Sequence, residues 1–338
     1  MIKHSVWPTA AKAIAVLCLL AVMSAMASSG IGAVMDASAV KEPNPKESSS
    51  DIAVETLRCK YFNEKDFMSS VLNTNASAPV TPAPAQIAGG VVPHHLLAGE
   101  MIAGFFEMLS HCSPDTVVVI APNHKRVGVN GIHTSTLSWG TSFGVLEADQ
   151  SLTSMLIRDF NASQNTLLME EEHSISSLVP YIKYYLPDSK IVPILLHGNY
   201  STEDSVELGE WLAGFLAGQT SPYGSLSNCN DVSDAAGPDS HPRIAVIASV
   251  DFSHYLDKDT ADKMDAETLA AIQSYDIHTI SMMGNDNMDS PPSITALVST
   301  MEKAGLSAPK VLAHDNSSCI TGTGADYTTS YYTLLYCR

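Results

Sequence analysis

The 338-residue chain lacks the short motifs that mark many metal and redox sites, since it has no His-Glu-x-x-His segment and no Cys-x-x-Cys pair. No internal repeat is visible either. Basic residues are scarce, with 18 Lys and Arg against 36 Asp and Glu, which gives a formal charge of −18. We do not expect so acidic a chain to bind nucleic acid or anionic membranes.

The first 27 residues have the layout of a secretory signal peptide. A short basic start precedes an apolar run from Ala13 to about Ala27, and small residues at Ala25 and Ala27 suit cleavage after Ala27. An uncleaved anchor is the alternative, although the run is short for a membrane span. We therefore expect an exported protein, periplasmic or extracellular, with any membrane contact confined to an uncleaved N-terminal segment.

Two further regions have the composition of loops. Residues 28–51 are small, polar and proline-bearing, which predicts a flexible linker. Residues 219–242 are rich in Ser, Asp, Gly and Pro and are predicted to form a surface insertion. Residues 52–338 are predicted to be a single domain that contains this insertion.

Apolar, β-branched segments alternate with helical patterns along this domain. Helices are predicted at residues 149–160 and 258–274, and Pro180 is expected to kink another helix or to lie in its first turn. This alternation predicts an α/β domain with a central sheet flanked by helices. The sheet is predicted to be mixed, because the last two strands, residues 310–319 and 328–337, lie close in sequence.

The segment from Arg243 to Tyr255 is the most informative stretch of the domain. An apolar run that follows Pro242 stops abruptly at Asp251 and His254, a pattern typical of a buried strand that ends in polar residues. Ligands bind beyond the carboxyl ends of strands in open α/β sheets, so these two side chains are expected to line a site. The alternative is that they cap the next helix.

Further polar residues share this placement at a predicted strand end or helix start. They are His94 with His95, His124, the turn Asn316–Cys319, and Glu172 with His173. Imidazole and thiolate are good ligands for iron, copper or zinc, and carboxylates either bind a metal or orient the binding rings. Each residue also has a structural alternative, such as helix capping for His95 or simple exposure for His124.

The number of cysteines leaves one thiol over. Cleavage of the signal segment would leave Cys59, Cys112, Cys229, Cys319 and Cys337. An odd count in an exported protein means that one thiol is unpaired, and either metal binding or simple burial accounts for it.

Several segments taken together resemble the Memo-like family, also called AmmeMemoRadiSam system protein B, which is itself similar to the class III extradiol dioxygenases. The segments are VVPHHLLAG, APNH, SWGTSFGVLEAD, EEHSISSLVPYI with KIVPILL, ASVDFSHY followed by Asp265, and NSSCITG leading to TSYYT. They occur in family order from about Arg58 to the C-terminus, so the resemblance covers nearly the whole mature domain. DFSHY and EHSI are the most specific of them.

The resemblance implies one α/β domain with a metal site made of two imidazoles and a thiolate. The implied metal ligands are His94, His124 and Cys319. The implied catalytic residues, which would line the same pocket, are Asp251, His254, Glu172 and His173. The metal would be iron or copper, with zinc as an alternative. With Cys319 used in this way, two disulfides are predicted among Cys59, Cys112, Cys229 and Cys337.

The chain departs from the family pattern in three respects. PHHLLAG lacks the Gly and Tyr of the family's PHAGY-type turn, which leaves His95 as a competing ligand. MDSPPSI stands where many relatives have Cys-Gly before a Pro-Ile helix start, so that one thiol near the site is lost. The predicted export signal separates the chain from a radical-SAM partner, which is normally cytosolic.

Four functions remain open. The first is a non-haem iron or copper redox enzyme with dioxygenase-like chemistry on a small-molecule substrate. The second is a metal carrier or sensor outside the cytoplasm without turnover, and the third is a binding or scaffold protein. The fourth is a metal-dependent hydrolase. A serine hydrolase is disfavoured, because neither Ser253 nor Ser317 lies in a Gly-x-Ser-x-Gly elbow.

Overall fold

The computed structural model describes residues 55–77, 87–216, 243–324 and 326–338. These residues all belong to one compact unit, Ala53–Arg338. The predicted signal segment and linker, residues 1–51, and the predicted insertion at 219–242 lie outside the described residues. In the described part of the chain, no helix has both the length and the apolar character that a membrane span requires.

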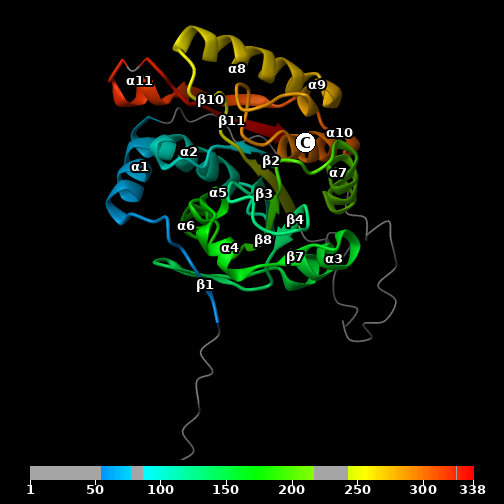
Figure 1. The fold of residues 1–338 in the computed structure, drawn as a ribbon. Helices are drawn as coiled ribbons and strands as arrows, with labels where there is room; N and C mark the ends of the chain where they lie inside the picture. The colour runs from blue at the N-terminus through cyan, green and yellow to red at the C-terminus, as the bar shows by residue number, and fades with distance from the viewer. Residues whose placement is uncertain (1–54, 78–86, 217–242, 325) are drawn as a thin grey trace, which may run out of the picture. The chain divides into compact units, whose positions relative to one another are not determined.

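An eight-stranded sheet runs through the centre of this unit (Figure 1). Its strands lie in the order β10-β11-β2-β9-β3-β8-β4-β7. Their bounds are β2 (Ile87–Val92), β3 (Thr116–Pro122), β4 (Ile132–Thr134), β7 (Ser163–Gln164), β8 (Lys190–Leu196), β9 (Ile244–Ser249), β10 (Lys310–Asn316) and β11 (Ser330–Cys337).

The central strands form a parallel core with antiparallel neighbours. In β9, β3 and β8, which run parallel, Val118 is level with Val246 on one side and Val192 on the other. These strands are rich in Val, Ile and Leu and are buried on both faces, as expected inside a parallel sheet. β11 pairs antiparallel with both β10 and β2. The predicted mixed sheet and α/β fold class are therefore confirmed.

Helices cover both faces of the sheet, each over its own hydrophobic cluster. One face carries α1 (Glu64–Ser77), α2 (Gly99–Ser110), α4 (Thr166–Glu171), α5 (His173–Ser176) and α6 (Val179–Tyr185). The other carries α3 (Gln150–Phe160), α7 (Thr202–Leu216), α8 (Lys258–Gln273), α9 (Ile277–Ser281) and α10 (Pro291–Lys303). The short helices η1 (Leu96–Ala98) and α11 (Ser317–Thr321) follow β2 and β10.

The predicted helices occur within a residue or two of their expected bounds. Asp149 is the N-cap of α3 and accepts a hydrogen bond from the backbone N–H of Leu152 at 3.0 Å, which explains why the helix begins there. Pro180 lies in the first turn of α6, where its missing N–H leaves no helical hydrogen bond unmade.

A second, three-stranded sheet holds the start of the described chain. It has the order β1-β5-β6, with β1 (Leu57–Arg58), β5 (Trp139–Thr141) and β6 (Gly144–Leu146). Leu57 and Trp139 are level with each other in this sheet and are fully buried. Burying one such apolar side chain contributes about 1.5–3 kcal/mol, so this pairing fixes the segment that leads into α1.

The close approach of β2 to β9 depends on Gly89. Its φ of +152° is a conformation that side-chain-bearing residues rarely adopt, and a Cβ atom there would lie 1.8 Å from the carbonyl oxygen of Val246. The two strands end level with each other. As a result, His94 and Asp251, each two residues beyond its strand, leave the sheet side by side.

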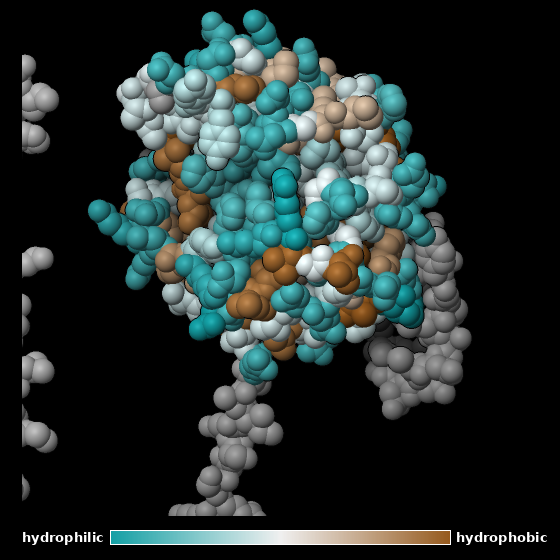
Figure 2. Space-filling view, in the orientation of Figure 1, coloured by the Kyte–Doolittle hydropathy of each residue, from teal (hydrophilic) through white to brown (hydrophobic). Residues whose placement is uncertain are grey.

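One face of the surface is visible by its hydropathy. The face shown in Figure 2 is largely hydrophilic, with smaller hydrophobic patches between polar side chains. Exposed apolar residues of this kind are ordinary on globular proteins, so this face by itself indicates no partner.

Candidate metal centre

Three neighbouring strands end at the same edge of the sheet. His94, Asp251 and His124 each lie two residues beyond the end of β2, β9 and β3 respectively. These strands are adjacent and parallel, so their carboxyl ends meet at one edge. The structure thus brings the three side chains to a single site.

A third imidazole joins this site from α5. The ring centroid of His173 lies 4.6 Å from that of His124 and 5.0 Å from that of His94, and the rings of His94 and His124 are 5.2 Å apart. Nitrogen atoms of the three rings lie within 4.8 Å of one another. One cation could therefore contact all three.

Asp289 lies at the middle of the cluster. Its Oδ2 is 3.2 Å from Nε2 of His94 and 3.3 Å from Nε2 of His124. The backbone holds it there, because the Asp289 N–H donates to the carbonyl of Asp251 at 3.1 Å and Met288 forms an antiparallel bridge with Phe252. The same carboxylate oxygen therefore contacts both imidazoles.

Asp289 is not among the site residues predicted from the sequence. It follows no strand in the sequence, and its segment, MDSPPSI, was interpreted only as the loss of a thiol. That departure was nevertheless the signal that could have identified it, because Asp can replace Cys as an anionic metal ligand.

Glu172 is fully buried and orients His124. Its Oε1 accepts a hydrogen bond from Nδ1 of His124 at 2.9 Å, and its Oε2 accepts one from the His124 backbone N–H at 2.8 Å. An ionised carboxylate can only accept, so Nδ1 carries a proton, and in the neutral ring Nε2 has the free lone pair. Glu172 Oε1 also lies 3.2 Å from Nδ1 of His173.

Ser249 orients His94 in the same sense. The Ser249 hydroxyl donates its only proton to the carbonyl of Ser174, so towards Nδ1 of His94, 3.2 Å away, it can only accept. Nδ1 of His94 therefore carries the proton and Nε2 faces Asp289. His94 and His124 therefore both present Nε2 to the carboxylate of Asp289.

Burial and charge oppose each other in this cluster. Burial alone would lower the pKa of His124, but hydrogen bonds to Asp289 and Glu172 outweigh it and raise that pKa to about 10. Burial also opposes the charged form of His94, yet Asp251 and Asp289 raise the pKa of His94 above its ordinary value. The imidazoles in turn hold the pKa values of Asp289 and Glu172 well below their usual range, against the effect of burial. The site is built to hold positive charge.

Asp251 and His254 lie in different surroundings. Asp251 Oδ1 accepts a hydrogen bond from the His94 backbone N–H at 3.1 Å, and its Oδ2 is 3.5 Å from Nε2 of His94. Asp251 forms a second group of candidate ligands with His94 and Asp289. His254 is half-buried and belongs to neither group, and its buried Nδ1 has no hydrogen-bond partner among the described residues.

Cys319 lies apart from both groups of candidate ligands. It is exposed in α11, and its backbone N–H donates to the side chain of Asn316 at 3.0 Å. Neither group found in the described part of the chain includes it. Its role as third ligand stays a prediction, while the position between the two imidazoles is filled by Asp289.

His95, the other possible ligand, is engaged elsewhere. Its Nδ1 lies 2.6 Å from the hydroxyl oxygen of Tyr331. It too is absent from both ligand groups of the described residues. The substituted PHHLLAG turn therefore still presents His94 to the centre.

The two predicted disulfides are wrong. Cys59, Cys112 and Cys337, three of the four cysteines expected to pair, are free thiols. All three pack against the hydrophobic cluster beneath α1 and α2, and burial raises the pKa of the Cys59 thiol to about 12. Cys229 lies outside the described residues.

The residues present fit a divalent metal. The second oxygen of Asp289, Oδ1, is buried without a hydrogen-bond partner among the described residues, and buried carboxylate oxygens normally have one. Imidazoles and carboxylates are ligand types that divalent metals take in proteins. His173 is close enough to be an additional ligand or a neighbour.

Comparison with known proteins finds similar sequences in one family. The family model described as Memo-like protein matches residues 60–221. A MEMO1 family protein of Pyrobaculum aerophilum is 27% identical over 257 residues, which cover 74% of this chain and 83% of the relative. The chain resembles the Memo-like family. A second MEMO1 family protein, from Methanosarcina mazei, is 27% identical over 243 residues, or 70% of this chain and 81% of that one.

The predicted resemblance to the Memo-like family is therefore confirmed. The matched range contains His94, His124, Glu172 and His173, whereas Asp289 lies beyond it. Among solved structures, an uncharacterized protein from Escherichia coli K12 matches 75% of this chain and 100% of its own length, with a TM-score of 0.43 and 11% identity.

Proposed function

We propose that this protein is a mononuclear metalloenzyme of the non-haem redox type, with His94, His124 and Asp289 as the metal ligands. The observation that carries the proposal is that Oδ2 of Asp289 lies 3.2 Å and 3.3 Å from the two imidazole Nε2 atoms. Such a set leaves coordination positions for oxygen and for a small-molecule substrate.

The donor atoms favour iron(II) over copper(I). A carboxylate is a harder ligand than a thiolate, and soft copper(I) is selected by sulfur ligands. Copper(II) and zinc remain compatible with the two imidazoles. The metal, when bound, would supply Lewis acidity and one-electron redox chemistry.

The surrounding residues orient groups and move protons. Glu172 accepts a hydrogen bond from Nδ1–H of His124, and Asp251 accepts one from the backbone N–H of His94. Both proposed ligands are therefore positioned in the metal-free protein. His173 and His254 carry imidazoles that are partly accessible and lie outside the two-histidine, one-carboxylate set. They are the groups that can take a proton from a substrate or return it.

Metal analysis of variants tests the ligand set. We expect protein purified without oxygen to hold close to one metal ion, and expect Asp289→Ala and His124→Ala to hold almost none. Cys319→Ala is the matched control and should keep the metal. Loss of metal in Cys319→Ala together with full retention in Asp289→Ala would overturn the assignment.

Oxygen consumption tests the chemistry separately. His254→Ala is expected to keep most of the metal and lose turnover, whereas His124→Ala loses both. If the metal-loaded protein consumes no oxygen with any phenolic substrate tested yet binds its metal tightly, the protein is a carrier or sensor and the redox proposal fails.

We also propose that the protein acts outside the cytoplasm. The proposal is supported by the basic, apolar and small-residue pattern of residues 1–27. Fractionation of cells that express the full chain, with N-terminal sequencing of the product, tests it. Recovery of the uncleaved chain in the cytoplasm would contradict it.

A further inference from the structure

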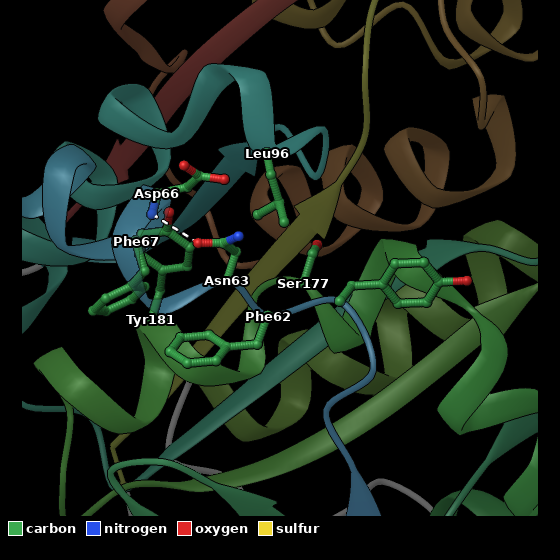
Figure 3. Close-up of a pocket in the computed structure, with 8 residues that line it drawn as sticks. Phe62, Asn63, Asp66, Phe67, Leu96, Ser177 and Tyr181 are labelled. Atoms are coloured by element: carbon green, nitrogen blue, oxygen red, sulfur yellow. Dashed lines mark hydrogen bonds between the residues drawn. The ribbon is translucent and has the colours of Figure 1, made fainter. Parts of the chain in front are cut away.

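A pocket lies between α1, η1 and the segment that joins α5 to α6 (Figure 3). Phe62, Phe67 and Tyr181 line it with aromatic rings, and Leu96 and Ser177 line it as well. Its empty space is about 270 Å³ when the open solvent at its mouth is included, and the room inside it is that of about one water-sized group. A small head group could enter it.

The pocket shares a wall with the metal centre. Tyr61 also lines it, and the Tyr61 ring centroid lies 5.8 Å from that of His173. The backbone N–H of Ser177 donates to the carbonyl of His173 at 3.1 Å. Leu96 follows His94 by two residues. A ligand held in the pocket would therefore lie next to the imidazole cluster.

Ser177 provides a polar group without a partner. Its side chain is 1% exposed, and its hydroxyl forms no hydrogen bond with any described residue. Figure 3 shows the hydroxyl directed toward Leu96, across the pocket. Buried hydroxyls are nearly always paired, so a ligand atom is the partner that this position lacks.

Asp66 is the only charged residue among the described residues that line the pocket, and it is acidic. Asp66 contributes an exposed carboxylate, and none of the ion pairs between described residues includes it. Its backbone N–H, not its carboxylate, is occupied by the side chain of Asn63 at 3.1 Å. The lining contains no Lys, Arg or His. Aromatic rings beside an unpaired carboxylate attract cations, since ring faces carry negative potential.

We propose that this pocket binds a primary ammonium group. The rings of Phe62, Phe67 and Tyr181 would contact the cation and its alkyl chain, Asp66 would supply the opposite charge, and the Ser177 hydroxyl would accept one N–H. A neutral hydroxyl compound could also pair with Ser177, but it would leave the carboxylate without a partner. The ammonium group belongs to a small amine or to a lysine side chain.

In this proposal the ammonium group binds to the pocket without help from the metal. A bound amine could also be the substrate of the neighbouring metal centre, and that part of the proposal rests on the proposed function. The measurement is therefore made on metal-free protein, and the metal content of each variant is determined separately, so that either proposal can fail alone.

Ligand-observed NMR with three probes tests the proposal. The probes are propylammonium, its neutral isostere 1-propanol, and Nα-acetyl-lysine amide, which keeps a free side-chain amine. The pH is chosen so that both amines are charged. Asp66→Asn should weaken amine binding roughly three- to tenfold, and Ser177→Ala should also weaken it. Asp204→Asn is the matched control, because Asp204 is likewise exposed in the first turn of a helix, α7, with its N–H bonded to the preceding Ser201 side chain at 3.0 Å.

Binding of either amine that falls in Asp66→Asn but not in Asp204→Asn supports the proposal. Binding of propylammonium alone identifies a small amine as the source, and binding of acetyl-lysine amide alone identifies a lysine side chain. Equal binding of 1-propanol, or amine binding unaffected by Asp66→Asn and Ser177→Ala, would overturn it. The proposal would also be overturned if none of the three probes bound to protein that circular dichroism shows to be folded.

Discussion

Glu172 serves two imidazoles with one carboxylate, since Oε1 lies 2.9 Å from Nδ1 of His124 and 3.2 Å from Nδ1 of His173. Glu172→Gln keeps the size and removes the charge. We expect iron(II) affinity to fall about 10–100-fold, as is typical when the partner of a ligating histidine is changed. Anaerobic titration measures it.

Glu171→Gln is the control for that variant. Glu171 is the preceding residue, is partly exposed and binds Lys60 at 2.6 Å instead of an imidazole. Equal loss of affinity in both variants would show that Glu172 acts only through general charge and not by orienting His124.

His124 makes metal binding dependent on pH. Its pKa is raised to about 10 from an ordinary value of 6.5, so the metal-free fold gains stability from the protonated ring. That stability is complete below 6.5 and is lost as pH rises through about 10. A metal must displace this proton, so we expect affinity to increase over the same pH range, with proton release on binding. Calorimetry in buffers of different ionisation enthalpy detects the release, and a pH-independent affinity would contradict this account.

Single residues differ in how far sequence reveals their role. His94, His124 and Asp251 each stand just beyond an apolar run, so the strand pattern locates them at the sheet edge. Asp289 reaches the same point by a backbone bridge to the segment after β9, and no local pattern records such a contact. Cys319 was implied by the family resemblance and not by a strand pattern, and its role as a ligand stays a prediction.

Helix α7 packs unusually close to α10, the helix that follows Asp289. A Cβ atom on Gly209 would lie 2.5 Å from the carbonyl oxygen of Ala296. We expect Gly209→Ala to destabilise the protein by about 1–3 kcal/mol, because α7 must move away. Urea unfolding measures the change.

Gly104, in the middle of α2, is the matched control. A Cβ atom there would meet its nearest neighbour, Thr74 Cγ2, at 3.5 Å, an ordinary contact. Gly104→Ala is therefore expected to stabilise the fold by up to about 1 kcal/mol through helix propensity. Changes of the same sign in both variants would contradict the packing argument.

Elements with strong local signals were predictable from the sequence. Asp149 caps α3 because its side chain accepts a hydrogen bond from a backbone N–H of the first turn. Pro180 fits the first turn of α6 because a backbone N–H is not needed there. The order of the strands was not predictable, since β2 lies between β11 and β9, which are distant from it in sequence. Such pairings depend on the whole fold.

Free thiols provide a test of the whole molecule. Cys59, Cys112, Cys319 and Cys337 are all unpaired. We expect thiol titration of the unfolded, unreduced protein to find at least four reactive groups. A count of one would restore the two disulfides that the sequence suggested and would require rearrangement around α2 and β11.

Asp289 directly precedes Ser290, the N-cap of α10. The N-terminus of a helix carries a partial positive charge that acts on groups within its first turn. A ligand placed there donates less electron density, so a bound ion would be harder to oxidise. If a metal binds at the proposed site, α10 would therefore raise its electrode potential, from a part of the chain that holds no proposed ligand itself.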